Sequence, residues 1–141
     1  MAAFNKFNAF SEDVAEKVHN LGADTLKVML TNTAPVATNS VKADLTEISA
    51  GNGYTAGGTA ASITSSSQTS GTYKLVLADV VFTASGGSMA TFRYAVLYND
   101  TPTSPADPLI GWWDYGSGVT LAAGETFTTD FDPTTGVLTL A

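Results

Sequence analysis

Six acidic side chains in the C-terminal half of the chain are the first candidates for chemistry. They are Asp100, Asp107, Asp114, Glu125, Asp130 and Asp132. Hydrolysis of a glycosidic bond needs two carboxyl groups placed across the sugar, one of them with a raised pKa. Most of these side chains lie beside Gly, Pro or Thr in expected loops, where Asp commonly caps turns. The spacing therefore does not favour a glycosidase. Calcium stays an alternative, although the D-x-[DN]-x-[DN]-G pattern of an EF-hand loop is absent.

A nucleophile with a histidine base is the next possibility. His19 is the one histidine of the chain. It falls in the last turn of an expected helix, where we predict an interaction with the helix dipole. No G-x-S-x-G elbow is present. The glycine-rich stretch 51–58 lacks the lysine and the following helix of a phosphate-binding loop, so we predict turns with positive φ there. The sequence thus predicts no catalytic residue, no cofactor and no metal site.

Large aromatic side chains are the other candidates, and they can stack on sugars or anchor proteins. They are Tyr94, Tyr98, Trp112, Trp113 and Tyr115. Adjacent residues of a strand point to opposite faces, so one tryptophan is expected in the core and the other outside or against a partner. Exposed Trp and Tyr anchor protein interfaces. We therefore name Trp112 and Tyr115 as candidate partner-binding residues, with sugar stacking as the alternative.

The first ten residues place three phenylalanines, Phe4, Phe7 and Phe10, at a spacing of three. Three such rings would not be left in water. Either the segment packs on its own domain, or it is an arm that docks on a neighbouring subunit. We name the three rings as candidate partner-binding residues, and we expect that removal of residues 1–10 leaves the rest of the chain folded.

Composition limits the classes of function. The 141 residues suit one domain, and 13% of them are charged, with a net charge of −7. Nucleic-acid binding needs clustered Lys and Arg, and an anionic membrane surface attracts the same residues, so we expect neither partner. The chain has no cysteine, which excludes disulfides and thiol catalysis. We expect no signal peptide and no membrane span.

The elements that must position these residues are mainly strands. Residues 91–115 predict a central strand–loop–strand unit, because period-two alternation is interrupted by a proline-rich loop. Residues 12–20 predict one short helix with Ser11 as its N-cap. Further strands are expected over 24–32, 73–83 with a bulge at Ala78–Asp79, 125–131 and 137–140. Residues 59–70 form either an edge strand or a mobile loop.

Together these patterns predict about seven strands. A turn is expected at 116–118, and a last hairpin is expected to pair 125–131 with 137–140 around the loop 132–136. On the strand 125–131, the side chains of Phe127, Thr129 and Phe131 should share one face. The fold class is all-β, an antiparallel β-sandwich or jelly roll with one short N-terminal helix. Residues 1–22 form the arm and helix, and 23–141 form the sandwich.

Several segments, in this order along the chain, resemble a family of small virion structural proteins of tailed bacteriophages and prophages. They are LKVMLTNTAPVATNSVKADLTEISAGNGYTAGG, LVLADVVFTASGG, RYAVLYNDT, PLIGWWDYG, GETFTTDF and GVLTL. Within this family the chain looks most like a capsid decoration, or cement, protein. The resemblance implies a non-enzymatic homotrimer that binds the major capsid protein on the capsid exterior after assembly in the host bacterial cytoplasm. Alternatives are a glycan- or receptor-binding fibre module and a tail structural subunit. An enzyme is the remaining class.

Overall fold

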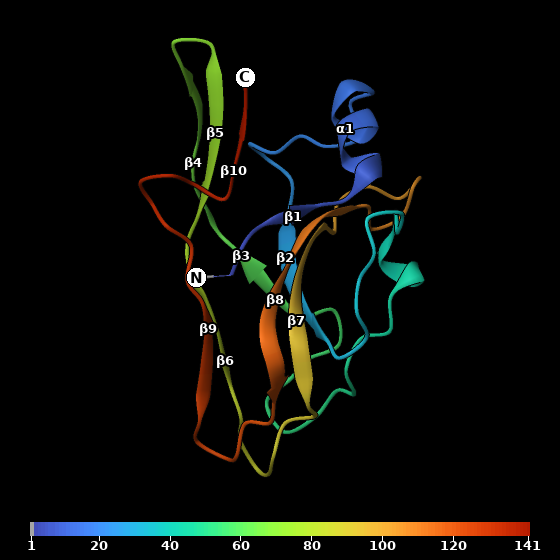
Figure 1. The fold of residues 1–141 in the computed structure, drawn as a ribbon, viewed down its shortest axis with the longest axis vertical. Coiled ribbons are helices and arrows are strands. Elements are labelled where there is room, and N and C mark those ends of the chain that lie inside the picture. Colours follow the sequence, from blue (N-terminus) through green and yellow to red (C-terminus); the bar gives the residue numbers. More distant parts are fainter. Residues whose placement is uncertain (1) are drawn as a thin grey trace.

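The computed structural model describes residues 2–141, so Met1 of the expected arm lies outside the described residues. Its elements are β1 (Asn5–Lys6), α1 (Asn8–Ala15), β2 (Leu26–Thr31), the 3₁₀ helix η1 (Lys42–Asp44), β3 (Thr59–Ala61), β4 (Ile63–Thr69), β5 (Thr72–Leu77), β6 (Val80–Thr83), β7 (Phe92–Asn99), β8 (Leu109–Val119), β9 (Thr126–Thr129) and β10 (Leu138–Leu140). Strands dominate and pack as antiparallel layers (Figure 1). The predicted fold class, an all-β sandwich with one short helix, is confirmed.

The first layer is a five-stranded sheet in the order β1-β8-β7-β2-β3. β7 lies at its centre and pairs with β8 on one side and β2 on the other, all antiparallel. The predicted strand–loop–strand unit over 91–115 is therefore confirmed. Almost every residue of β2 and β7 is buried, because both faces of this sheet are covered.

The second layer is a long ribbon made of the sheets β10-β5-β4 and β6-β9. β5 leads into β6 through Ala78 and Asp79, where a bulge was predicted, and the break separates the two sheets. β3 belongs to the first layer and β4 to the second, so the chain crosses between layers at Ser62. The segment 59–70 thus forms strands, which was one of the two alternatives.

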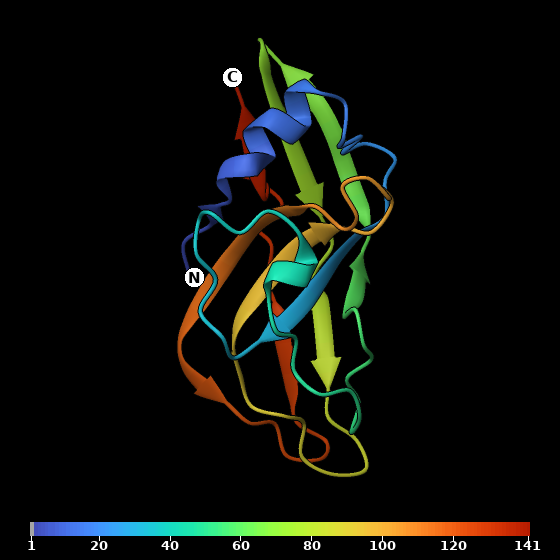
Figure 2. The same cartoon turned by 90° about the vertical axis from the view of Figure 1, so that its right-hand side faces the viewer.

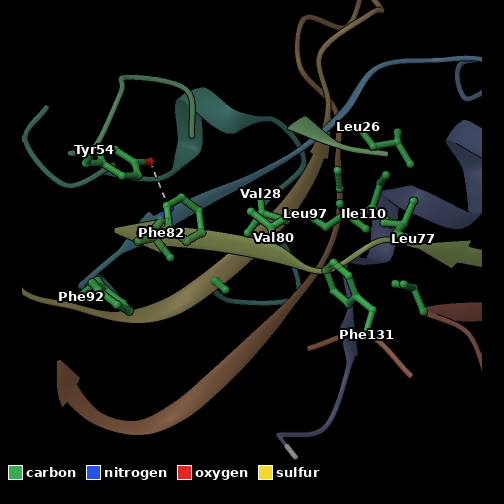
Figure 3. Close-up of a cluster of buried hydrophobic side chains, with 14 of the residues drawn as sticks. Leu26, Val28, Tyr54, Leu77, Val80, Phe82, Phe92, Leu97, Ile110 and Phe131 are labelled. Atoms are coloured by element: carbon green, nitrogen blue, oxygen red, sulfur yellow. Dashed lines mark hydrogen bonds between the residues drawn. The ribbon is translucent and has the colours of Figure 1, made fainter. Parts of the chain in front are cut away.

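The main core lies between the two layers (Figure 3). The first sheet contributes Leu26, Val28, Leu97 and Ile110, and the ribbon contributes Leu75, Leu77, Phe82 and Phe131. A second cluster on the other face of the first sheet contains Phe7, Met29, Val96, Tyr98 and Leu109. Figure 2 shows the segment around η1 crossing this outer face. Leu45 from that segment packs on the second cluster.

Helix α1 begins four residues earlier than predicted and ends at Ala15. Phe7, not Ser11, occupies the N-cap position, and Phe7 and Phe10 are buried. Lys17 adopts a positive φ of 66° just after the helix, which a continuing helix cannot accommodate. Burial of the two rings therefore outweighs the local capping signal at Ser11.

The last predicted hairpin is wrong. β9 pairs with β6, and β10 pairs with β5. Asp79 accepts a hydrogen bond from the Phe131 N–H at 2.8 Å, and the Val137 N–H donates to the Leu75 carbonyl at 2.8 Å. These two bonds hold both ends of the loop 132–136 against the second layer. The chain therefore keeps its direction across the loop, and β9 and β10 do not form a hairpin.

The turn predicted at 116–118 lies instead inside β8, as a bulge. Phe92 pairs with Val119 and Tyr94 with Asp114, so the residues 115–118 oppose the single residue Arg93. The extra residues shift the strand register. Period-two alternation along β7 would place Phe92 on the face of Val96, but Phe92 packs in the main core and Val96 in the second cluster.

Candidate functional site

An aromatic groove opens between the C-terminal half of β8 and strand β9. Its volume is about 290 Å³, and its lining includes Arg93, Trp113, Tyr115, Phe127, Asp130 and Phe131. On the opposite side of the sandwich the chain itself links the layers at Ser62. On this side β8 and β9 belong to separate sheets (Figure 1), and side chains of both strands line the opening between them. We refer to this feature as the aromatic groove.

The rings of the groove are held by their neighbours. The ring centroid of Trp113 lies 5.4 Å from that of Phe4 and 5.5 Å from that of Phe131. Tyr115 and Phe127 meet edge to face at 5.6 Å. Tyr115 is 56% exposed, whereas Trp113 is half-buried. Such pairs stabilise beyond the area they bury. The groove is therefore a preformed apolar surface.

An ion pair borders the groove. Arg93 donates from Nε and Nη2 to the two carboxylate oxygens of Asp114 at 2.8 and 3.0 Å. Asp114 also accepts a hydrogen bond from the Gly116 N–H at 2.8 Å. The Arg93 side chain and the Gly116 N–H lower the pKa of Asp114, and the Asp114 carboxylate raises the pKa of Arg93. The charge of Arg93 is thus compensated locally.

Asp130 carries the second carboxylate of the groove. Its side chain is exposed and makes no hydrogen bond or ion pair with the residues that the structure describes. The neighbouring Thr129 hydroxyl is already used, because it donates to the Val80 carbonyl at 3.0 Å. Asp130 therefore leaves one uncompensated negative charge at the rim of an apolar groove.

The five residues named from sequence do not form one patch. Phe7 and Phe10 are 0% and 1% exposed and lie in the chain's own core. Trp112 is half-buried and packs on Phe7 at 4.5 Å, on the outer face of the first sheet. Phe4 packs beside the groove, and Tyr115 lines it. In the structure the N-terminal segment packs on its own domain, which was one of the two alternatives. Phe7 and Phe10 are therefore not free to anchor a partner in this fold.

Sequence reasoning did not assemble the groove. The alternation of Phe127, Thr129 and Phe131 was recognised, but their strand was paired with the wrong neighbour. The predicted pairing therefore did not bring the groove residues of β9 next to those of β8. Arg93 had no predicted role, and Asp130 was considered as one of six carboxylates for acid–base catalysis or calcium binding. The pairing of 126–129 with 80–83 joins segments far apart in the chain and leaves no local signal.

His19 does not lie in a helix, so its predicted role at a helix C-terminus is wrong. Its side chain is buried in the loop after α1, and burial lowers its pKa to about 4. The glycine-rich stretch behaves as predicted, with positive φ at Gly51, Gly53, Gly57 and Gly58. Across residues 2–141 no group of three or more His, Asp or Glu side chains is placed to hold a metal ion.

No protein-family model, curated protein or solved structure was found to match the chain. Within the described part of the chain, no helix is long and apolar enough to cross a membrane.

Proposed function

We propose that the chain is a non-enzymatic structural protein of a tailed-bacteriophage virion, and within that class a capsid decoration protein. Its partner is the major capsid protein, and it acts as a homotrimer on the capsid exterior. The proposal rests on the ordered segments that resemble this family and on one structural observation, the aromatic groove. A preformed groove with an exposed tyrosine and a half-buried tryptophan has the composition of a protein-contact anchor.

The chemistry of the surface supports a contact made by shape. Only 13% of residues are charged, and Arg93 at the groove is neutralised by Asp114. A contact of this kind discriminates by fit rather than by electrostatic steering. A protein that binds only the assembled lattice stabilises it by mass action, by about 2.7 kcal/mol per site at 100 times Kd.

Co-sedimentation with undecorated capsids tests the proposal. The chain should pellet with assembled capsids and not with free capsid subunits. Tyr115→Ser should weaken this binding by about tenfold or more, the effect of losing an interface anchor. Val81→Ser is the matched control, because Val81 is 51% exposed on β6, close to the 56% of Tyr115. Equal loss by both variants, or binding to free subunits, would contradict the proposal.

A glycan-binding fibre module is the second candidate, favoured by Tyr115 and Trp113 beside the free carboxylate of Asp130. A sugar face stacks on such rings, and its hydroxyls bond to such carboxylates. The two candidates differ in a simple assay. A fibre module retains the chain on immobilised oligosaccharides, whereas a decoration protein shows no retention. Electron microscopy of particles then places the copies on head or tail, which also tests the alternative of a tail subunit.

A further inference from the structure

The aromatic groove combines an apolar floor with a single uncompensated charge. Trp113, Tyr115, Phe127 and Phe131 provide the floor. Arg93 and Asp114 neutralise each other at 2.8 Å, which leaves the carboxylate of Asp130 at the rim. The chain as a whole carries a net charge of −7. The field at the groove therefore favours a cation and disfavours an anion.

A long cationic side chain matches this layout. Lysine and arginine have an apolar stem and a charged end, so the stem lies on apolar surface while the end reaches a polar partner. The faces of Trp113 and Tyr115 attract cations. A carboxylate such as that of Asp130 accepts charge-assisted hydrogen bonds from a guanidinium or ammonium group.

A sugar matches the groove less well. Each sugar ring brings several hydroxyls, and each buried hydroxyl needs a hydrogen-bond partner. Arg93 is engaged by Asp114, and the Thr129 hydroxyl is engaged by Val80. The hydroxyls of Tyr115 and Thr128 and the carboxylate of Asp130 remain for a ligand. One carboxylate and two hydroxyls satisfy a single cation better than they satisfy the several hydroxyls of a sugar ring.

The strands beside the groove indicate the form of the occupant. β1 pairs with β8 only at Gly111 and Trp112, so from Trp113 onward β8 has β7 as its single strand partner among residues 2–141. β9 has a strand partner only in β6 within the same described residues. Neither free edge carries a lysine between 113 and 119 or between 126 and 129. Such edges accept an extended segment by strand addition. Lysine, one protection against it, is absent, and the bulge at residues 115–118 protects only part of the β8 edge.

We propose that the aromatic groove binds an extended segment of a partner protein through one lysine or arginine side chain. The stem of that side chain lies on Trp113 and Tyr115, and its charged end pairs with Asp130. The inference deepens the proposed function and rests on it for the identity of the partner. The chemistry of the groove stands on the residues above.

Short peptides test the chemistry with the full chain and without particles. The probe is a capped pentapeptide, acetyl-TVRVT-amide, titrated into labelled protein while the amide signals of Tyr115, Phe127 and Asp130 are followed by NMR. The control peptide carries citrulline, which has the shape of arginine without its charge. The arginine peptide should bind at least about fivefold more tightly than the citrulline peptide. Asp130→Asn should remove most of this difference. Glu16→Gln, the same charge change at an exposed residue just after helix α1, should keep it.

Each outcome decides the inference. Equal affinity for the two peptides, an unchanged preference in Asp130→Asn, or no shift at millimolar peptide would overturn it. Shifts of the same signals by neutral oligosaccharides, without shifts by the arginine peptide, would favour the glycan-binding alternative. Peptide binding without co-sedimentation on capsids would remove the proposed partner and leave the chemistry of the groove intact. Co-sedimentation without a preference for the arginine peptide would keep the proposed partner and overturn the proposed chemistry of the groove.

Discussion

The side-chain amide nitrogen of Asn99 lies 3.0 Å from Nδ1 of His19, which joins the end of β7 to the loop that follows α1. The same amide donates to the Asp24 carboxylate at 2.7 Å. An amide N–H is a donor, so Nδ1 of His19 accepts and Nε2 carries the proton. That Nε2 is buried without a hydrogen bond in the described residues, 3.9 Å from Asp13. The arrangement fits a neutral imidazole.

We predict that acid destabilises the fold through His19. Its pKa is lowered from 6.5 to about 4 by burial, against a smaller opposing effect of Asp24. Between these values the unfolded chain binds a proton that the folded chain does not, so stability falls as pH drops through this window. Asp13 lies nearby, and burial raises its pKa, which acts in the opposite sense at the acid end. The net loss should be about 1–3 kcal/mol.

Urea unfolding at a series of pH values measures this effect. The matched variant is His19→Gln, which cannot titrate but retains a side-chain acceptor for Asn99. Its stability curve should be flatter than that of the natural chain between the two pKa values. Parallel curves for the two proteins would show that other groups govern the acid response.

The place of the arm depends on a glycine of β8, and this gives a second prediction. An added Cβ on Gly111 would overlap the ring of Phe4 and would lie 2.8 Å from the Asn5 carbonyl oxygen. Gly111→Ala should therefore displace the arm and cost about 1–3 kcal/mol, the usual range for overpacking. Gly118→Ala in the same strand meets only a Thr91 methyl at 3.3 Å and should cost less. In a double-mutant cycle, Phe4→Ala should recover part of the loss. Additive costs would mean that the ring is not the obstacle.

The third prediction revises what the sequence alone suggested for the N-terminal segment. Removal of residues 1–10 was expected to leave the sandwich folded, but Phe7 and Phe10 are 0% and 1% exposed. Phe7→Ala and Phe10→Ala should each cost about 3–5 kcal/mol, because each leaves a cavity in a packed core. Ser11→Ala is the control, since Ser11 is exposed and does not cap the helix. A truncated chain as stable as the full chain would show that the arm is dispensable.

The elements that could be predicted are those whose sequence pattern lies within a single short segment. Tyr94, Val96 and Tyr98 alternate with Ala95 and Leu97 on a strand whose two faces are both buried, and the proline-rich loop after it ends the strand clearly. The partner of β9 was not predictable, because its bonds depend on Asp79 and Val80, some fifty residues earlier. The predicted hairpin around Asp132 and Gly136 closes a short loop, which costs less chain entropy than pairing two distant segments. The groove was not predictable for the same reason, because it is formed by residues of both β9 and β8.

The last prediction concerns the ion pair that borders the groove. The carboxylate of Asp114 holds the Gly116 N–H at 2.8 Å while it pairs with Arg93. Gly116 has a φ of 102° within the bulge of residues 115–118. An exposed ion pair contributes little to global stability, so Asp114→Ala should hardly change the unfolding midpoint. It should instead loosen the bulge, because the Gly116 N–H loses its acceptor.

Hydrogen–deuterium exchange at Gly116 measures this local effect. The amide should exchange about tenfold faster in Asp114→Ala, as expected for the loss of one charge-assisted hydrogen bond. Asp132→Ala removes a comparable bond to the Thr134 N–H at 2.7 Å in another loop and should leave Gly116 unchanged. The lowered pKa of Asp114 adds a pH signature. The bond is present above the ordinary carboxyl pKa of 3.8 and is lost as pH falls through the lower pKa of the folded state. If Gly116 exchanges at the same rate in both variants, the Asp114 carboxylate does not hold the bulge.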